Sequence, residues 1–137
     1  MKRVVVTGMA GMTSLGCDWE TIVANFRAQR SGIRRMDESD RFSELNTRLA
    51  GPIDDFVVPA HWTRKQLRSM GRVSRLAVWA AEQALQDAGL LGDASIKDGR
   101  MGVACGSSTG STDEIKAFGN MLLNSVAEGL NANSYVR

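Results

Sequence analysis

The residue types best suited to chemistry lie together where a short apolar run, residues 101–105, leads into a turn of Gly, Ser and Thr at residues 106–111. The run predicts a buried strand. The small residues of the turn let another backbone or a ligand approach closely, and its two glycines can adopt a positive φ. Ser111 followed three residues later by Glu114 predicts a capping box, and therefore the start of a helix.

A strand, a glycine-rich turn and a helix start have two interpretations. The amides of the turn and of the first helical turn are free to bind an anion or an oxyanion. The same small residues also let a helix pack closely on a strand, which is the commoner use of such turns in α/β folds. The pattern alone leaves both interpretations open.

Cys105 is a nucleophile by residue type, but no base stands beside it in the sequence. A cysteine flanked by apolar residues in a strand is typical of a small core residue, so we expect a buried thiol that resists alkylation. His61, the single histidine, precedes a predicted helix. We expect it to be a surface or capping residue rather than a ligand.

The composition limits the classes of function. With 137 residues, of which 43% are hydrophobic and 23% charged, the chain can form one domain or part of one. The 17 basic and 15 acidic residues are spread along the sequence, which argues against a nucleic-acid partner. The apolar runs are shorter than the ~20 residues of a membrane span. Two cysteines are too few for a zinc site and fit a reducing compartment, so we expect a cytoplasmic protein without metal, cofactor or membrane contact.

The chain begins with a β-branched run at residues 4–6 and a glycine-rich loop at residues 7–16. Asp18 then predicts the cap of a helix that stops at Ser31-Gly32. This order is typical of a dinucleotide-binding unit, but the fingerprint fails. Ala10 and Thr13 occupy two of the glycine positions of one version, and Met12 and Ser14 those of the other. A nucleotide-binding module is therefore disfavoured.

Residues 34–62 are irregular, with a short edge strand expected within residues 49–53. Thr63 and Gln66 predict a capping box that opens a helix reaching Ala88, with Gly71 marking a break. The broad, Ala-rich apolar surface of this helix predicts burial between layers. The helix after Ser111 is expected to direct a second apolar set toward the core: Ile115, Phe118, Met121, Leu122, Leu123 and Val126.

Four separated motifs resemble the N-terminal part of the β-ketoacyl-acyl carrier protein synthases, and most of all the elongating type II enzymes. They occur in the family's order and span essentially the whole chain: Val4-Val5-Val6-Thr7-Gly8 with Thr13 and Gly16; Ser31-Gly32-Ile33; Ala80-Ala81 through Asp87-Ala88-Gly89-Leu90; and Gly102-Val103 with Gly106-Ser107. The chain departs from the family where Ala10 replaces a usual glycine and Ser14 a usual proline.

The resemblance implies a thiolase-like α/β fold, in which two related halves form five layers and the protein is usually a homodimer. Residues 1–137 would form most of the N-terminal half as a single, incomplete synthase domain. The implied reaction is a decarboxylative Claisen condensation, with acyl and malonyl groups delivered by acyl carrier protein, in fatty acid or related polyketide biosynthesis. The alternative is a non-catalytic subunit like the chain-length factors of ketosynthase heterodimers.

The resemblance assigns no catalytic residue to this chain. The family's nucleophilic cysteine would follow Arg137, Cys105 aligns with a core strand residue, and His61 matches neither catalytic histidine. Three residues fall at or near positions that shape acyl pockets: Thr109 at the gate, Ser108 beside it, and Tyr135 near a segment that lines the partner's pocket. A plain packing role is the alternative for each.

Overall fold

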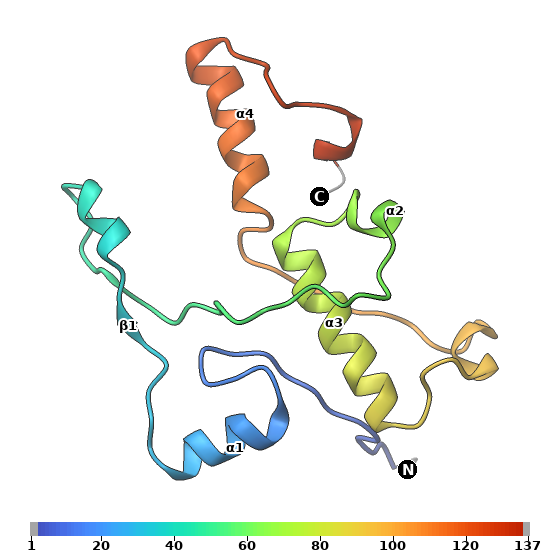
Figure 1. Cartoon of the computed structure of the whole chain (residues 1–137). Coiled ribbons are helices and arrows are strands. Elements are labelled where there is room, and N and C mark those ends of the chain that lie inside the picture. The colour runs from blue at the N-terminus through green and yellow to red at the C-terminus, as the bar shows by residue number, and fades with distance from the viewer. Residues whose placement is uncertain (1–2, 136–137) are drawn as a thin grey trace.

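The computed structural model describes residues 3–135, except the side chains of Asn133 and Tyr135. Helix α3 lies in the middle of the molecule, and the other elements extend away from it (Figure 1). The elements are, in chain order: α1 (Trp19–Arg27), β1 (Arg34–Arg35), η1 (Asp37–Arg41), β2 (Leu49–Ala50), α2 (Arg64–Leu67), α3 (Arg72–Asp87), η2 (Ala94–Lys97), α4 (Thr112–Asn124) and η3 (Ala132–Tyr135).

The starts of three helices confirm what the sequence predicts. Asp18 caps α1, where its Oδ1 accepts the Thr21 N–H at 2.7 Å. Thr63 and Gln66 form the predicted capping box of α2. The expected break at Gly71 is present, because α2 ends at Leu67 and Gly71 is the N-cap of α3.

Other helix predictions need correction. Helix α1 ends at Arg27, before Ser31-Gly32, and Gln29 beyond it has a positive φ of 53°. Ser111 is the N-cap residue of α4, but its side chain makes no capping hydrogen bond, so the capping box with Glu114 does not form. The apolar side of α4 is not in a core: Leu123 is 84% exposed, and Ile115, Leu122 and Val126 are exposed as well.

The two strands expected at residues 4–6 and 101–105 are extended segments without strand pairing. Val103 is 92% exposed, and Val4, Val5 and Val6 are also exposed. A strand requires hydrogen bonds from a neighbour, and the described residues provide none to these segments. The expectation of buried strands is therefore wrong for the chain as it stands.

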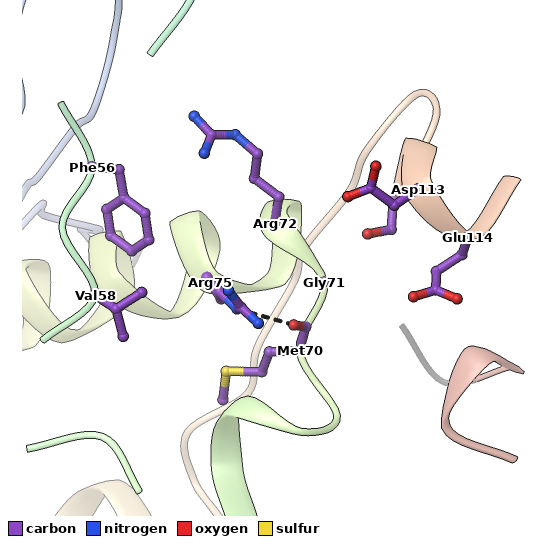
Figure 2. Close-up of a pocket in the computed structure, with 9 residues that line it drawn as sticks. Phe56, Val58, Met70, Gly71, Arg72, Arg75, Asp113 and Glu114 are labelled. Carbon is purple, nitrogen blue, oxygen red and sulfur yellow. Dashed lines mark hydrogen bonds between the residues drawn. The ribbon is translucent and has the colours of Figure 1, made fainter. Parts of the chain in front are cut away.

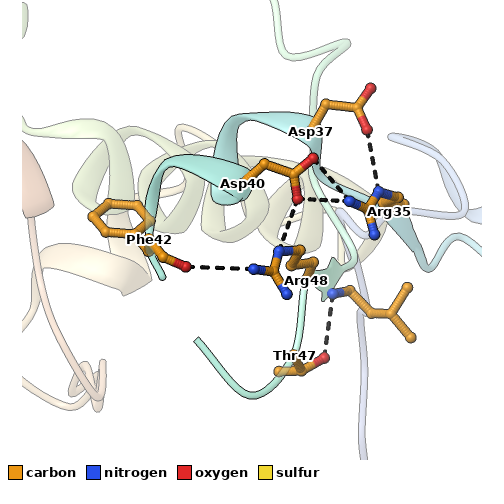
Figure 3. A network of polar contacts seen from close by, with 7 residues as sticks. Arg35, Asp37, Asp40, Phe42, Thr47 and Arg48 are labelled. Atoms are coloured by element: carbon orange, nitrogen blue, oxygen red, sulfur yellow. Dashed lines mark hydrogen bonds and ion pairs between the residues drawn. The ribbon is translucent and has the colours of Figure 1, made fainter. Parts of the chain in front are cut away.

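The only sheet of the described residues is a two-residue antiparallel pair, in which Arg34 lies opposite Ala50 and Arg35 opposite Leu49. The predicted edge strand is thus confirmed at Leu49–Ala50. A network of ion pairs joins the two ends of the segment that connects these strands (Figure 3). Asp40 Oδ1 lies 2.6 Å from the Arg35 guanidinium and 2.7 Å from Arg48 Nε. The hydrogen bond between Arg35 and Asp40 is also the largest cause of the raised pKa of Arg35.

The first loop is fixed to the end of α3. The Met9 N–H donates to Asp87 Oδ2 at 2.9 Å, and Gly8 lies against the backbone of Ala84 and Ala88.

The core is small: among described apolar side chains, only Ile22 and Trp62 are buried. The accessible surface is 11074 Å², whereas a compact monomer of this mass exposes about 7000 Å².

Candidate functional site

The turn at residues 106–111 connects an extended segment to α4, as the sequence predicts. Gly110 has a φ of +68°, the conformation that favours glycine, and its N–H donates to Ser107 Oγ at 3.0 Å. Ser111 is buried at the end of the turn, whereas residues 106–109 are exposed. A hydrogen bond therefore fixes the base of the turn, and the residues at its tip are exposed to solvent.

The structure brings two of the three predicted substrate-binding residues together. Ser108 Oγ and Thr109 Oγ1 are 3.3 Å apart on the exposed tip. Tyr135 ends η3, but its side chain lies outside the described residues.

A cavity of about 370 Å³ lies beside the start of α4 and is lined by Ser111, not by Ser108 or Thr109 (Figure 2). Its wall carries two arginines and two acids, which leaves no excess of one charge; the lining residues are Phe56, Val58, Met70, Gly71, Arg72, Arg75, Ser111, Asp113 and Glu114. Arg75 Nε donates to the Met70 carbonyl at 3.1 Å, and Arg72 donates to the Ile53 carbonyl. The guanidinium groups thus serve to hold backbone in place.

Neither cysteine thiol has a hydrogen bond to a base among the described residues. Cys105 is exposed, which corrects the expectation of a buried thiol. Residues 101–105 form an unpaired extended segment, and no neighbouring strand among the described residues covers the thiol. Burial raises the pKa of the Cys17 thiol, and the nearby carboxylates of Asp55 and Asp18 raise it further. A raised pKa lowers the thiolate fraction, which is the reactive form.

His61 is a surface residue, as predicted, with a partner that the sequence does not reveal. Its Nε2 lies 2.7 Å from Glu82 Oε1 on α3, and the Trp62 indole N–H donates to the other oxygen of Glu82 at 3.1 Å. Sequence reasoning missed the contacts of Glu82, and it gave Asp87 only as part of a family motif, without its contact to Met9. The available signal for Glu82 was an acid within the broad apolar surface of a predicted helix.

The described residues contain neither a metal site nor a membrane-spanning helix. No group of three His, Cys, Asp or Glu side chains is placed to hold a metal ion. No described helix has both the length and the apolar character needed to cross a membrane.

The fold matches those of two solved ketosynthase structures. A crystal structure of a β-ketoacyl synthase from Burkholderia phymatum superimposes on 99% of this chain with a TM-score of 0.92 and 56% identity, and the chain covers 33% of it. A ketosynthase/chain length factor structure for ishigamide gives a TM-score of 0.66 and 28% identity over 97% of this chain. The chain is therefore part of a thiolase-like α/β fold.

The family follows from the sequence comparison. The family model "Beta-ketoacyl synthase, N-terminal domain" matches residues 1–134, and the chain belongs to this family. The 3-oxoacyl-[acyl-carrier-protein] synthase 1 of Haemophilus influenzae is 36% identical over 114 residues, which are 81% of this chain and 27% of that protein. Synthase 2 of Staphylococcus aureus is 31% identical over 89% of this chain and 29% of its own length. The chain thus spans under a third of these curated relatives.

Proposed function

We propose that this chain is the N-terminal part of a 3-oxoacyl-[acyl-carrier-protein] synthase that acts as a cytoplasmic homodimer. The observation that carries the proposal is the agreement with the Burkholderia phymatum β-ketoacyl synthase, at 56% identity over 99% of the chain. Identity at this level extends beyond a shared fold. The names of the curated relatives favour acyl carrier protein as the partner that delivers the substrates.

The proposed reaction of the whole protein is a decarboxylative Claisen condensation. A cysteine thiolate takes the acyl group from acyl carrier protein and releases the carrier thiol. Malonyl carrier protein loses carbon dioxide, and the resulting carbanion attacks the acyl thioester. A carbon–carbon bond forms while the bond to the cysteine sulfur breaks, which restores the thiolate. Two histidines would assist decarboxylation, and two backbone amides would hold the oxyanion.

The residues of this chain supply shape rather than chemistry in that scheme. Thr109 would gate the acyl pocket with Ser108 beside it, and Tyr135 would lie near the pocket of the partner subunit. The hydrogen bond within the turn supports this role, because it fixes the base of the turn while the Thr109 side chain stays exposed. Since nucleophile and histidines act as a unit, we expect residues 1–137 alone to be inactive.

A second candidate is a non-catalytic subunit of a ketosynthase heterodimer. The observation that favours it is the match to the ishigamide ketosynthase/chain length factor. That match is weaker in both identity and TM-score than the synthase match. An Ala-Cys motif encoded after Arg137 would favour the enzyme, and its replacement there would favour the non-catalytic subunit.

The test is release of carbon dioxide from malonyl carrier protein. We expect turnover by the protein made from the complete reading frame when acyl carrier protein is also supplied, and none by residues 1–137. Decarboxylation by the short chain alone would contradict the assignment of its residues. The second candidate would be supported if the complete protein bound acyl carrier protein but gave no condensation product, whether it was a monomer or a homodimer.

A further inference from the structure

The turn that carries Thr109 is clamped by the side chain of Ser107. Its Oγ accepts the Gly110 N–H at 3.0 Å, so the hydrogen bond spans Ser108 and Thr109 at the exposed tip. A serine hydroxyl that binds a nearby backbone N–H stabilises a turn in place of a backbone hydrogen bond. Ser107 can therefore restrain the backbone of the tip without being part of it.

The described residues provide little else to restrain this turn. Among them, residues 106–110 form no backbone–backbone hydrogen bond. Beyond the adjacent residues, a Cβ built on Gly106 or Gly110 would meet no described atom within 4 Å, so packing does not hold the turn. The Ser111 side chain makes no capping hydrogen bond, so the start of α4 adds no side-chain clamp. The Ser107 hydroxyl is thus the main restraint that this part of the chain supplies.

The backbone of the tip determines where the Thr109 side chain lies. Thr is branched at Cβ and has few favourable χ1 rotamers, so its methyl and hydroxyl groups follow the backbone closely. Thr109 Oγ1 is also 3.3 Å from Ser108 Oγ, which places both hydroxyls on one side of the tip. Gly110 has a φ of +68°, a conformation that favours glycine, and its N–H is bound in that conformation. A change at Ser107 should therefore move Thr109, although the hydrogen bond does not involve Thr109.

We propose that Ser107 is a positioning residue for the selection of acyl chains. Its hydroxyl binds the Gly110 N–H and thereby holds the Thr109 side chain at one place in the acyl pocket. The inference rests on the proposed function for the role of Thr109 as the gate. It goes further because it assigns control of that gate to a residue that acts through the backbone of the turn.

The test uses the protein made from the complete reading frame and compares kcat/KM for short and long acyl chains on acyl carrier protein. Ser107→Ala removes the acceptor and frees the turn. The ratio of kcat/KM between the preferred and the disfavoured chain length should then fall toward one by about 2- to 12-fold, the factor that corresponds to one net hydrogen bond. Ser107→Thr keeps the hydroxyl and should restore the original ratio.

A matched control removes a similar hydrogen bond from another loop. Ser31 is also exposed, and its Oγ accepts the Ile33 N–H at 3.2 Å. Ser31→Ala should leave the chain-length ratio unchanged. Hydrogen exchange followed by mass spectrometry checks the clamp itself. The peptide that contains Gly110 should exchange faster in Ser107→Ala but not in Ser107→Thr or Ser31→Ala, because only the first change frees its N–H.

A double-mutant cycle distinguishes positioning of Thr109 from a general structural effect. In a Thr109→Ala background, Ser107→Ala should no longer change the chain-length ratio, because the side chain through which Ser107 acts is absent. A general loss of stability would change the ratio equally with and without the Thr109 side chain.

The outcomes separate this inference from the proposed function. An active protein whose ratio does not respond to Ser107→Ala would show that packing in the complete synthase fixes the turn, which overturns the inference and leaves the function standing. Equal effects of Ser107→Ala in the two backgrounds would also overturn it. A complete protein that forms no condensation product would contradict the proposed function, and the inference would fall with it.

Discussion

Gly8→Ala tests whether the first loop is fixed by the end of α3. A Cβ at this position would meet the Ala84 carbonyl oxygen most closely, and would lie 2.7 Å from Ala88 N and 2.8 Å from Ala88 Cβ. Ordinary contacts of a Cβ begin near 3.4 Å. The obstacles are mostly helix backbone, which cannot rotate away as a flexible side chain could. The added methyl group must therefore push the loop off α3 and strain the hydrogen bond from Met9 to Asp87.

Overpacking of this kind costs about 1–3 kcal/mol of unfolding free energy. With an m-value of about 2 kcal/mol/M, the urea midpoint should fall by roughly 0.5–1.5 M. Gly119→Ala is the matched control, because Gly119 lies inside α4 with open space around it. That control should raise stability by about 0.5–1 kcal/mol, since Ala is the better helix former. Equal midpoints for Gly8→Ala and the unsubstituted chain would refute the close contact between loop and helix.

Three further predictions concern Glu82, Asp18 and Thr109. Glu82→Ala should lower the unfolding free energy by about 1–3 kcal/mol, because it leaves the indole N–H of the buried Trp62 without its acceptor; an unchanged urea midpoint would contradict this. The Thr21 N–H holds the pKa of Asp18 below its ordinary value, so the stability from this cap is present above the unfolded-state pKa and is lost as pH falls through the folded-state pKa. Asp18→Asn should keep the cap but flatten that acid-side loss of helicity in circular dichroism, and an identical pH profile would argue against the linkage. In the complete synthase, Thr109→Phe should lower kcat/KM for long acyl chains relative to short ones by roughly 5- to 150-fold, whereas equal values for both chain lengths would remove Thr109 from the gate.

The helices could be predicted because their signals are local. A cap such as Asp18 binds an N–H three residues away, and the Thr63–Gln66 capping box is complete within four residues. Gly71 separates α2 from α3 for an equally local reason. Each of these contacts forms between residues a few positions apart, whatever the position of the rest of the chain. A short stretch of sequence is therefore enough to predict it.

The strands expected at residues 4–6 and 101–105 could not be predicted in the same way, because a strand depends on a neighbour that its own sequence does not specify. Residues 4–6 and 101–105 have the β-branched or apolar character of strands, yet both remain unpaired among the described residues. The prediction of a buried Cys105 was wrong for the same reason. The apolar pattern of these two segments predicts burial under neighbouring elements, and the described residues provide no such elements.

The site was partly visible in the sequence. The composition of residues 106–111 predicted the turn, and Ser108 and Thr109 are neighbours along the chain. The contacts of Glu82 were missed because its partners lie 20 and 21 residues away, and the contact of Asp87 because it binds Met9 across 78 residues. Such pairs become apparent only when the packing of α3 against two loops is known.

Gly32 shows how one residue can be correctly singled out for the wrong reason. The sequence suggests that it stops α1, but that helix has already ended at Arg27. A Cβ at Gly32 would collide with the Ser14 hydroxyl and carbonyl oxygens, and one at Gly51 would lie 2.9 Å from Ser14 Oγ. Two glycines that are far apart in the chain therefore leave room for one side chain of the first loop. The Ser31-Gly32-Ile33 motif is thus best explained by the approach of Ser14 to its backbone, and the end of α1 has to be explained by residues 28 and 29 instead.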